Sequence, residues 1–247
     1  MSDTEIVTVR CLQDNYAYLL RANGMTALFD APEPGPILDA LSQRGWTLDQ
    51  ILLTHHHGDH IDGVTEIVSK TGASVTGARA DAHRLPDLDI QVNPGETTEA
   101  AGLQARVIDV SGHTVGHIAF YLPDAKAAFT GDSLMALGCG RIFEGDAAMM
   151  WDSLIRLNAL PEDTLICSGH DYCAGNGAFA SSVDPDNPEL TQRIEETANS
   201  LRPCAPATLK EERLTNPFLR APELAESLGE ADAAAAFARL RKMKDNF

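Results

Sequence analysis

Four histidines and one aspartate lie within the seven residues THHHGDH at positions 54–60. Residues two apart in an extended chain point to the same side, so His55 and His57 are expected to converge on one point. Asp59 and His60 follow a glycine, which lets the chain turn, and are expected to face a second point nearby. Imidazole and carboxylate groups suit zinc, iron or manganese and give no preference for copper(I). The segment therefore predicts a metal site rather than a solvated loop.

Further metal-type side chains occur after predicted strands elsewhere in the chain. They are His113 and His117 in SGHTVGH, Asp132 in TGDS and His170 in SGHDY. One carboxylate has two oxygens, so Asp132 can bridge two cations about 3.5–4 Å apart. Loops at strand ends are where a rigid sheet presents catalytic groups. These residues extend the prediction from one metal to two.

The segments between these motifs predict the elements that must position them. Apolar runs such as Ile51–Leu53 are typical of buried strands, and apolar residues at helical spacing, as in residues 61–70, are typical of helices. Strands are expected at 6–11, 16–20, 27–30, 51–53, 74–77, 103–110, 117–122, 127–129 and 164–167, and helices at 36–45, 61–70 and 146–160.

The character of the chain changes after about residue 177. Prolines punctuate segments of helical composition, β-type runs disappear, and helices are expected at 189–201, 209–214 and 232–244. We therefore expect a mixed α/β domain over residues 1–174 and a small helical domain over residues 175–247.

Charge and composition exclude several classes of partner. The formal net charge is −17, from 19 basic and 36 acidic side chains, which disfavours nucleic acid. No apolar run approaches the roughly 18 residues that a membrane helix needs. The acidic residues 1–5 precede no long apolar run, so we expect no signal peptide, and a cytoplasmic monomer. The five cysteines have no CxxC spacing and are expected to be reduced thiols: Cys11, Cys139, Cys167, Cys173 and Cys204.

The chain resembles the metallo-β-lactamase superfamily and, within it, the hydroxyacylglutathione hydrolase (glyoxalase II) family. The motifs that carry the resemblance are THHHGDHIDG at 54–63, SGHTVGH at 111–117, TGDSLMALGCGRIFEG at 130–145, SGHDY at 168–172 and NPFLR at 216–220. The resemblance implies a four-layer αβ/βα sandwich followed by a small C-terminal all-helical domain.

The resemblance also implies a binuclear site for divalent ions, with zinc expected and iron or manganese as alternatives. Three histidines hold one ion, an aspartate and two histidines hold the other, and one aspartate bridges: His55, His57 and His113; Asp59, His60 and His170; and Asp132. Asp59 and Asp132 are the implied catalytic residues. His56 and His117 match positions that do not ligate, so we expect them to support the loops.

The expected substrate contacts come from the same resemblance. Arg141, Tyr172 and Arg220 match positions that contact glutathione, whereas Phe143 stands where some relatives have tyrosine. Further cations near the C-terminus are alternatives for holding the substrate carboxylates: Arg239, Arg241, Lys242 and Lys244.

The implied reaction is hydrolysis of the thioester in S-(2-hydroxyacyl)glutathione. With S-D-lactoylglutathione the products are glutathione and D-lactate, a step in methylglyoxal detoxification. A thiol with a pKa near 8.5 leaves readily as thiolate, so no dedicated general acid is required. Asp59 is expected to combine the roles of ligand and proton acceptor.

Two other functions compete with this interpretation. A mononuclear iron glutathione-persulfide dioxygenase shares the fold, and the HIDG segment at 60–63 does not separate the two enzymes. His60 and His170, which supply a second metal, and the NPFLR motif favour the hydrolase. A non-enzymatic metal-binding module needs no open position for water, so nothing in the sequence favours it.

Overall fold

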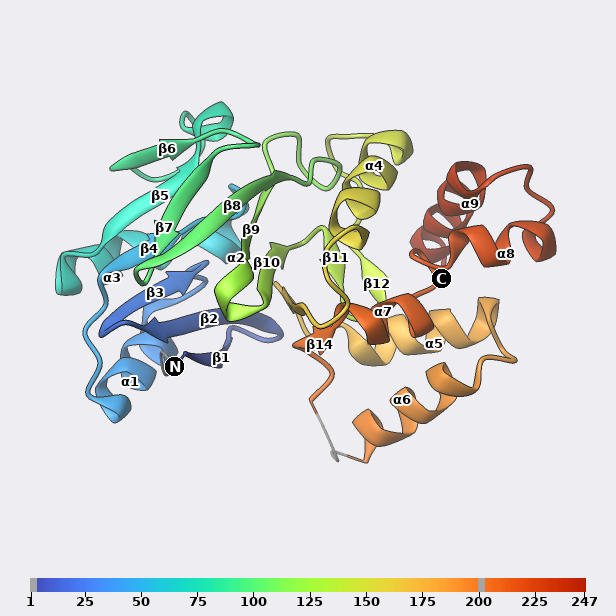
Figure 1. Cartoon of the computed structure of the whole chain (residues 1–247), viewed down its shortest axis with the longest axis horizontal. Helices are drawn as coiled ribbons and strands as arrows, with labels where there is room; N and C mark the ends of the chain where they lie inside the picture. Colours follow the sequence, from blue (N-terminus) through green and yellow to red (C-terminus); the bar gives the residue numbers. More distant parts are fainter. Residues whose placement is uncertain (1–3, 200–202) are drawn as a thin grey trace. The chain divides into compact units, whose positions relative to one another are not determined.

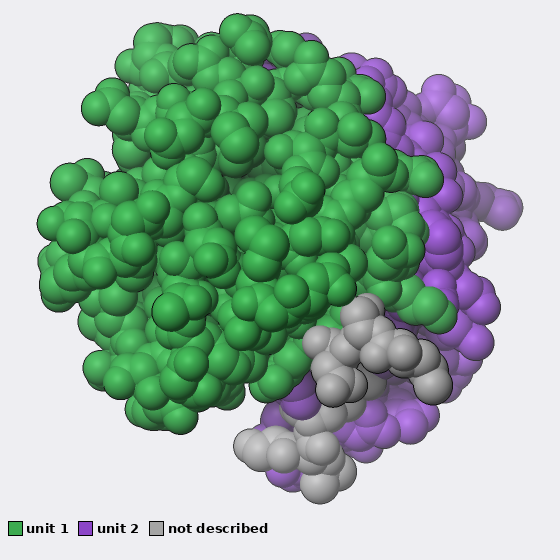
Figure 2. Space-filling view, turned by 60° about the vertical axis from the view of Figure 1, so that its left-hand side comes forward, with its two compact units in different colours: residues 1–109, 116–131 green, residues 110–115, 132–247 purple. Residues whose placement is uncertain are grey.

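The computed structural model describes residues 4–199 and 203–247. It divides into two compact units: unit 1 comprises residues 1–109 and 116–131, and unit 2 comprises residues 110–115 and 132–247 (Figure 2). The expected domains, 1–174 and 175–247, have different boundaries from these units and remain a prediction. Residues 1–3 of the acidic start and residues 200–201 of the expected helix 189–201 lie outside the described residues.

Unit 1 contains a six-stranded sheet whose strands follow the order of the chain (Figure 1). The strands are β1 (Glu5–Cys11), β2 (Asn15–Ala22), β3 (Met25–Phe29), β4 (Gln50–Leu52), β5 (Ser74–Ala78) and β6 (Ile90–Val92). The first three pair antiparallel, and β3 to β6 pair parallel. Helices α1 (Pro34–Arg44), α2 (Gly58–Ile61) and α3 (Val64–Thr71) lie in the crossover connections of the parallel part.

A second, antiparallel set of strands completes unit 1. It consists of β7 (Thr97–Ala100), β8 (Leu103–Asp109), β9 (Ile118–Leu122) and β10 (Ala127–Gly131), with the short 3-10 turn η2 (Pro123–Ala125) between the last two. Another 3-10 turn, η1 (Arg79–Asp81), follows β5 of the first sheet. Residues of β8 alternate between buried and exposed, whereas β9 and β10 are buried throughout. The alternation in β8 indicates a strand with one face packed and one in water.

The first sheet of unit 1 buries both of its faces. On one face, Leu19 and Leu28 share a core with Ile37 of α1. On the other face, the Phe29 ring stacks on Phe129 of β10 with 3.4 Å between the ring centroids. Burial on both sides explains why β2 reads as an almost continuous apolar run rather than an alternating one.

Unit 2 consists mainly of helices, with two short pairs of strands. The strands are β11 (Leu134–Met135) with β12 (Gly138–Cys139) and β13 (Leu165–Ser168) with β14 (Ala207–Thr208). The helices are α4 (Ala147–Asn158), α5 (Cys173–Val183), α6 (Pro188–Ala198), α7 (Leu209–Thr215), α8 (Ala221–Leu228) and α9 (Ala233–Asp245).

Most of the expected elements are confirmed within a few residues, but three helices, α2, α5 and α8, and the short strands β6, β7, β11 and β12 were not predicted. Helix α5 has one buried face, but that face includes Asn176 and Gly177 while Ala174 and Ala178 lie on the exposed face, so the sequence lacks the apolar stripe by which a helix is recognised. Helix α8 carries a proline in its first turn, where the missing N–H costs nothing. The strand β14 corrects the expectation that the tail contains no β-structure. Among the described residues, no helix is long and apolar enough to cross a membrane.

The expectation of five reduced cysteines is wrong for two of them. Cys173, at the start of α5, forms a disulfide with Cys204. Cys11, Cys139 and Cys167 are free and buried. Burial raises the pKa of Cys11 to about 12 and also raises the pKa of Cys167, so both thiols behave as small apolar groups.

Candidate metal centre

In unit 1, the histidine loop is anchored to the end of the neighbouring parallel strand. Asp30 follows β3 and Thr54 follows β4 at the same edge of the sheet. The Asp30 carboxylate accepts hydrogen bonds of 2.8 Å from both the backbone N–H and the hydroxyl of Thr54. Asp30 has a φ of 56°, in the left-handed region that aspartate tolerates better than most residues. This pairing fixes where the histidine loop leaves the sheet.

The same carboxylate orients His60. Asp30 Oδ2 lies 2.8 Å from His60 Nδ1, and both side chains are buried. A carboxylate accepts, so Nδ1 carries the proton and donates it, and Nε2 keeps its lone pair. A histidine held in this way is prepared to bind a metal through Nε2.

Asp59 is held by a residue from another strand. Asn15, the buried first residue of β2, donates its side-chain N–H to the Asp59 carbonyl oxygen at 2.9 Å and to Asp59 Oδ2 at 3.1 Å. These contacts fix both the backbone and the carboxylate of Asp59.

The imidazole rings of the loop lie close to one another. The His55 and His57 ring centroids are 4.8 Å apart, as the two-residue spacing predicts. His117 stacks on His55 with 4.6 Å between centroids and 10° between the planes. His117 therefore contacts an expected ligand, and its supporting role remains a prediction.

Asp30, His55 and His60 also offer donor atoms close enough to hold an ion. Two ligands of one zinc ion, each about 2.0–2.1 Å from it, lie roughly 3.3 Å apart in tetrahedral geometry. The separation of 2.8 Å between Asp30 Oδ2 and His60 Nδ1 is shorter and matches a hydrogen bond. We therefore interpret Asp30 as the residue that orients His60 and not as a ligand.

In unit 2, one oxygen of Asp132 lies between two histidines. Asp132 Oδ2 is 3.5 Å from His113 Nε2 and 3.3 Å from His170 Nε2. Both distances match the spacing of two ligands on one metal ion. The three side chains are buried. The arrangement fits an oxygen shared between two ions, one beside each histidine.

His113 is oriented by the loop that follows β12. Its Nδ1 donates to the Arg141 carbonyl oxygen at 2.7 Å, so Nε2 keeps the lone pair with which a histidine can bind a metal. Gly140 permits this close approach, since a Cβ at that position would lie 1.9 Å from the Asp132 carbonyl oxygen. The backbone N–H of Phe143 donates to the His113 carbonyl oxygen at 3.2 Å. Glycine at position 140 is therefore a steric requirement of the site.

His170 contacts a residue that lines a small pocket of unit 2. Its ring stacks on Tyr172 with 4.6 Å between centroids. Tyr172 and Lys244 both line the pocket, whose volume is about 370 Å³. Lys244 Nζ donates to the Gly175 carbonyl oxygen at 2.8 Å. Burial, and then the nearby Arg241 guanidinium, lower the pKa of Lys244 from that of an ordinary lysine.

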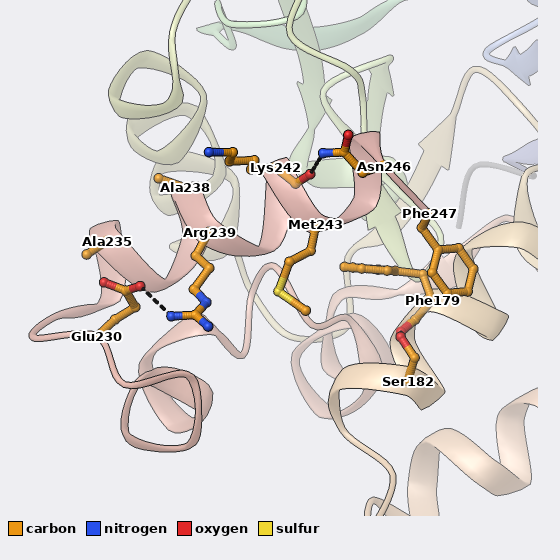
Figure 3. Close-up of a pocket in the computed structure, with 10 residues that line it drawn as sticks. All are labelled: Phe179, Ser182, Glu230, Ala235, Ala238, Arg239, Lys242, Met243, Asn246 and Phe247. Carbon is orange, nitrogen blue, oxygen red and sulfur yellow. Dashed lines mark hydrogen bonds and ion pairs between the residues drawn. The ribbon is translucent and has the colours of Figure 1, made fainter.

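The sequence leaves four cations of α9 as alternatives for holding the substrate carboxylates, and the structure shows that their surroundings differ. Arg239 and Lys242 line an open groove of about 880 Å³ together with Met243, and Arg239 pairs there with Glu230 at 3.1 Å (Figure 3). Of the four, Lys244 alone lines the pocket beside Tyr172.

Arg241 is buried and serves the loop that carries Gly140. Its guanidinium donates to the Cys139 carbonyl oxygen at 2.8 Å and pairs with Asp245 at 2.9 Å. Burial raises the pKa of the Cys139 thiol, an effect that Arg241 only partly opposes. Cys139 is therefore not an activated thiol.

Two of the expected substrate contacts, Arg141 and Arg220, differ in the exposure and the ion pairing of their side chains. The Arg141 side chain is 63% exposed and lies over the Phe143 ring, 5.8 Å from its centroid. Arg220 pairs with Asp184 at 2.7 Å. Arg141 is therefore the more accessible of the two cations, and both substrate contacts remain predictions.

The residues that orient the expected ligands were not predicted in that role, and Arg241 was named only as a candidate cation for the substrate. Asp30, Asn15 and Arg241 act through the ligands or their loops. The sequence does contain a local indication for Asp30. In ALFD a single acidic residue follows an apolar run, as Asp132 follows the apolar run of AAFTGD. Asn15 and Arg241 carry no such local signal.

Comparison with known proteins first gives the class. Residues 13–170 match the profile of the metallo-β-lactamase superfamily. A solved structure, TTHA1623 in a di-iron-bound form, is 26% identical with a TM-score of 0.63, over 87% of this chain and all of that one. The mixed α/β architecture and its clusters of histidine and aspartate agree with this superfamily of metal-dependent proteins, and they suit divalent ions.

The helical tail and the full-length relatives then give the family. Residues 171–247 match the profile of the hydroxyacylglutathione hydrolase C-terminus. The hydroxyacylglutathione hydrolases of Ruegeria pomeroyi and Cereibacter sphaeroides are 55% and 54% identical, over 98% of this chain and 99% of theirs. The chain belongs to the hydroxyacylglutathione hydrolase family, as the motifs predict, and the dioxygenase alternative is not favoured.

Proposed function

We propose that this enzyme hydrolyses the thioester bond of S-(2-hydroxyacyl)glutathione. S-D-lactoylglutathione is the expected substrate, which would give glutathione and D-lactate and would serve methylglyoxal detoxification. The relatives named above support this substrate class. The observation that carries the proposal is the position of Asp132 Oδ2, 3.5 Å and 3.3 Å from the ligand nitrogens of two histidines.

The proposal includes two divalent ions, with zinc expected. One is assigned to His55, His57 and His113, the other to Asp59, His60 and His170, with Asp132 shared. When bound, such ions act as Lewis acids that polarise a thioester carbonyl and lower the pKa of water towards about 7. Nitrogen and oxygen ligands also accept iron or manganese, and the di-iron form of TTHA1623 keeps iron as an alternative.

The protein's own groups have three tasks in this reaction. Asp30 and the Arg141 carbonyl oxygen hold His60 and His113 with Nε2 unprotonated. Asn15 holds the Asp59 carboxylate, which is assigned to accept the proton of the attacking water. The glutathione thiolate leaves without an acid, because its conjugate thiol has a pKa near 8.5.

The substrate is assigned to Arg141, Tyr172 and Arg220, together with Lys244. Glutathione carries carboxylates, and Lys244 is the cation of α9 that lines the pocket with Tyr172. Binding by Arg220 would require it to share or leave its contact with Asp184. We therefore rank Arg141 and Lys244 above Arg220.

We further propose a cytoplasmic monomer. Glutathione is the main thiol buffer of the cytosol, which supplies the substrate class there. The disulfide between Cys173 and Cys204 is unusual for that compartment, where thiols are mostly kept reduced. Size-exclusion chromatography with light scattering tests the monomer, and a reporter fusion tests the compartment.

The direct test is an assay of purified, zinc-loaded protein on S-D-lactoylglutathione. Loss of the thioester absorbance should be matched by equal amounts of free thiol and D-lactate. Oxygen uptake with glutathione persulfide, with no loss of the thioester, would instead identify the dioxygenase.

A further inference from the structure

The histidine between the first two expected ligands, His56, forms a closed cluster with two other polar side chains, Asp81 and Arg84. His56 Nδ1 lies 3.2 Å from Asp81 Oδ2, and its Nε2 lies 3.3 Å from Arg84 Nη1. Arg84 also donates to Asp81 Oδ1, at 2.6 Å from Nη2 and 3.2 Å from Nε. Each of the three side chains therefore contacts both of the others.

The geometry fixes the tautomer of His56. A guanidinium has donors and no acceptor, so His56 Nε2 must accept from Arg84. The proton therefore sits on Nδ1, which donates to the Asp81 carboxylate. A ring held from both nitrogens cannot turn without breaking a hydrogen bond. The backbone that carries His55 on one side and His57 on the other is restrained with it.

Asp81 also packs against the second histidine motif. A Cβ at Gly116 would lie 2.1 Å from Asp81 Cγ, so only glycine allows this approach. Asp81 is buried, with its side chain 3% exposed, whereas Arg84 is 28% exposed. One carboxylate thus contacts both the loop of residues 54–60 and the turn before His117.

We infer that Asp81 and Arg84 are positioning residues of the metal centre, acting through His56. This inference rests on the proposed function, because it takes His55 and His57 as ligands. The cluster restrains the loop so that both ligand rings face the same point before a metal arrives. Neither residue is among those assigned to hold an ion or the substrate.

The test compares zinc affinity between variants, using competition with a chromophoric chelator. Arg84→Met removes the hydrogen bonds of the guanidinium to His56 and Asp81. Asp81→Asn leaves a single oxygen, which can accept from His56 or from Arg84 but not from both in this geometry. We expect zinc affinity to fall about tenfold in each, at the lower end of the effect of removing groups that orient ligands. Arg84→Lys keeps a donor and should recover part of the affinity. The cobalt(II) absorption spectrum should change in Arg84→Met as well.

The matched control is Arg79→Met, on the same 3-10 turn as Asp81. Arg79 is exposed and reaches only the Gln91 carbonyl oxygen, at 3.5 Å, among the hydrogen bonds described. Its zinc affinity should equal that of the wild type, and the metal-free melting temperatures of the two arginine variants should be similar.

Two results would overturn the inference. One is wild-type zinc affinity in folded Arg84→Met and Asp81→Asn. The other is an equal loss in Arg79→Met, which would indicate a general effect of removing charge. Neither measurement requires turnover. Wild-type protein that binds two zinc ions and leaves the thioester intact would contradict the proposed function without affecting this comparison.

Discussion

Replacing Asp30 by asparagine tests how the fold prepares a ligand. The change keeps the size of the side chain and tolerates the left-handed backbone at this position. The carboxylate now accepts three hydrogen bonds of 2.8 Å, two from Thr54 and one from His60. An amide has one oxygen, so it cannot accept from all three donors in this geometry.

The asparagine amide can be placed in two orientations. The one that loses fewer favourable contacts keeps the amide oxygen as acceptor for the Thr54 backbone N–H. Its NH₂ group then faces the Thr54 hydroxyl, which can rotate to accept, and His60 Nδ1. His60 can accept there only if its proton moves to Nε2, which removes the lone pair assigned to the metal. The variant therefore stabilises the wrong tautomer of His60.

The size of the effect follows from these contacts. A hydrogen bond to a charged group contributes about 1.5–3 kcal/mol, so the metal-free variant should lose about that much stability. Loss of a group that orients a ligand histidine lowers metal affinity about 10–100-fold. Chelator competition measures the affinity, and urea unfolding of the metal-free protein measures the stability.

Asp49→Asn is the control for Asp30→Asn. Asp49 Oδ2 accepts from the Thr26 backbone N–H at 2.7 Å in the same unit, and an amide oxygen can replace it there. Zinc affinity should be unchanged in this variant. Wild-type zinc affinity and activity in Asp30→Asn would refute the argument that Asp30 sets the tautomer of His60.

Three further predictions follow from the site. Asp132→Ala should bind fewer than two metal equivalents and lose most thioesterase activity; full activity with two metals would exclude a bridging role. Gly140→Ala should lower stability by about 1–3 kcal/mol, since its Cβ would lie 1.9 Å from the Asp132 carbonyl oxygen, whereas Gly35→Ala, with open space around it, should not. Lys244→Met should raise KM with little change in kcat. Because the pKa of Lys244 is lowered, its positive charge is lost at a lower pH than in an ordinary lysine, so KM for the anionic substrate should rise with pH below about 10.4 in the wild type. A flat KM over that range, or the same rise in Lys244→Met, would contradict this assignment.

The sequence contains a local signal for the expected metal ligands but not for the residues that orient them. Histidines two apart after an apolar strand identify a metal loop locally, and the His55 and His57 rings do lie 4.8 Å apart. Asp30 meets Thr54 only because β3 and β4 pair in parallel, and Asn15 reaches Asp59 across 44 residues of chain. Such partners depend on strand order, which local patterns do not specify.

A helix whose two faces have similar residues was also not predictable from the sequence. In α5 the polar Asn176 lies on the buried face and Ala174 and Ala178 lie on the exposed face, so its residues show no helical period of hydrophobicity. The disulfide joins cysteines 31 positions apart, and spacing alone gives no reason to pair Cys173 with Cys204 rather than with another cysteine. The bounds of the long, amphipathic α4, by contrast, follow its apolar stripe closely.

Metal removal and return is the most direct test of a binuclear thioesterase. Purified protein is stripped with a chelator, and zinc is added back stepwise while bound metal and hydrolysis of S-D-lactoylglutathione are measured on the same samples. We expect stripped protein to be inactive and activity to reach its plateau at two equivalents of zinc. Stripped protein that hydrolyses the thioester at the rate of the metal-loaded enzyme would contradict the account.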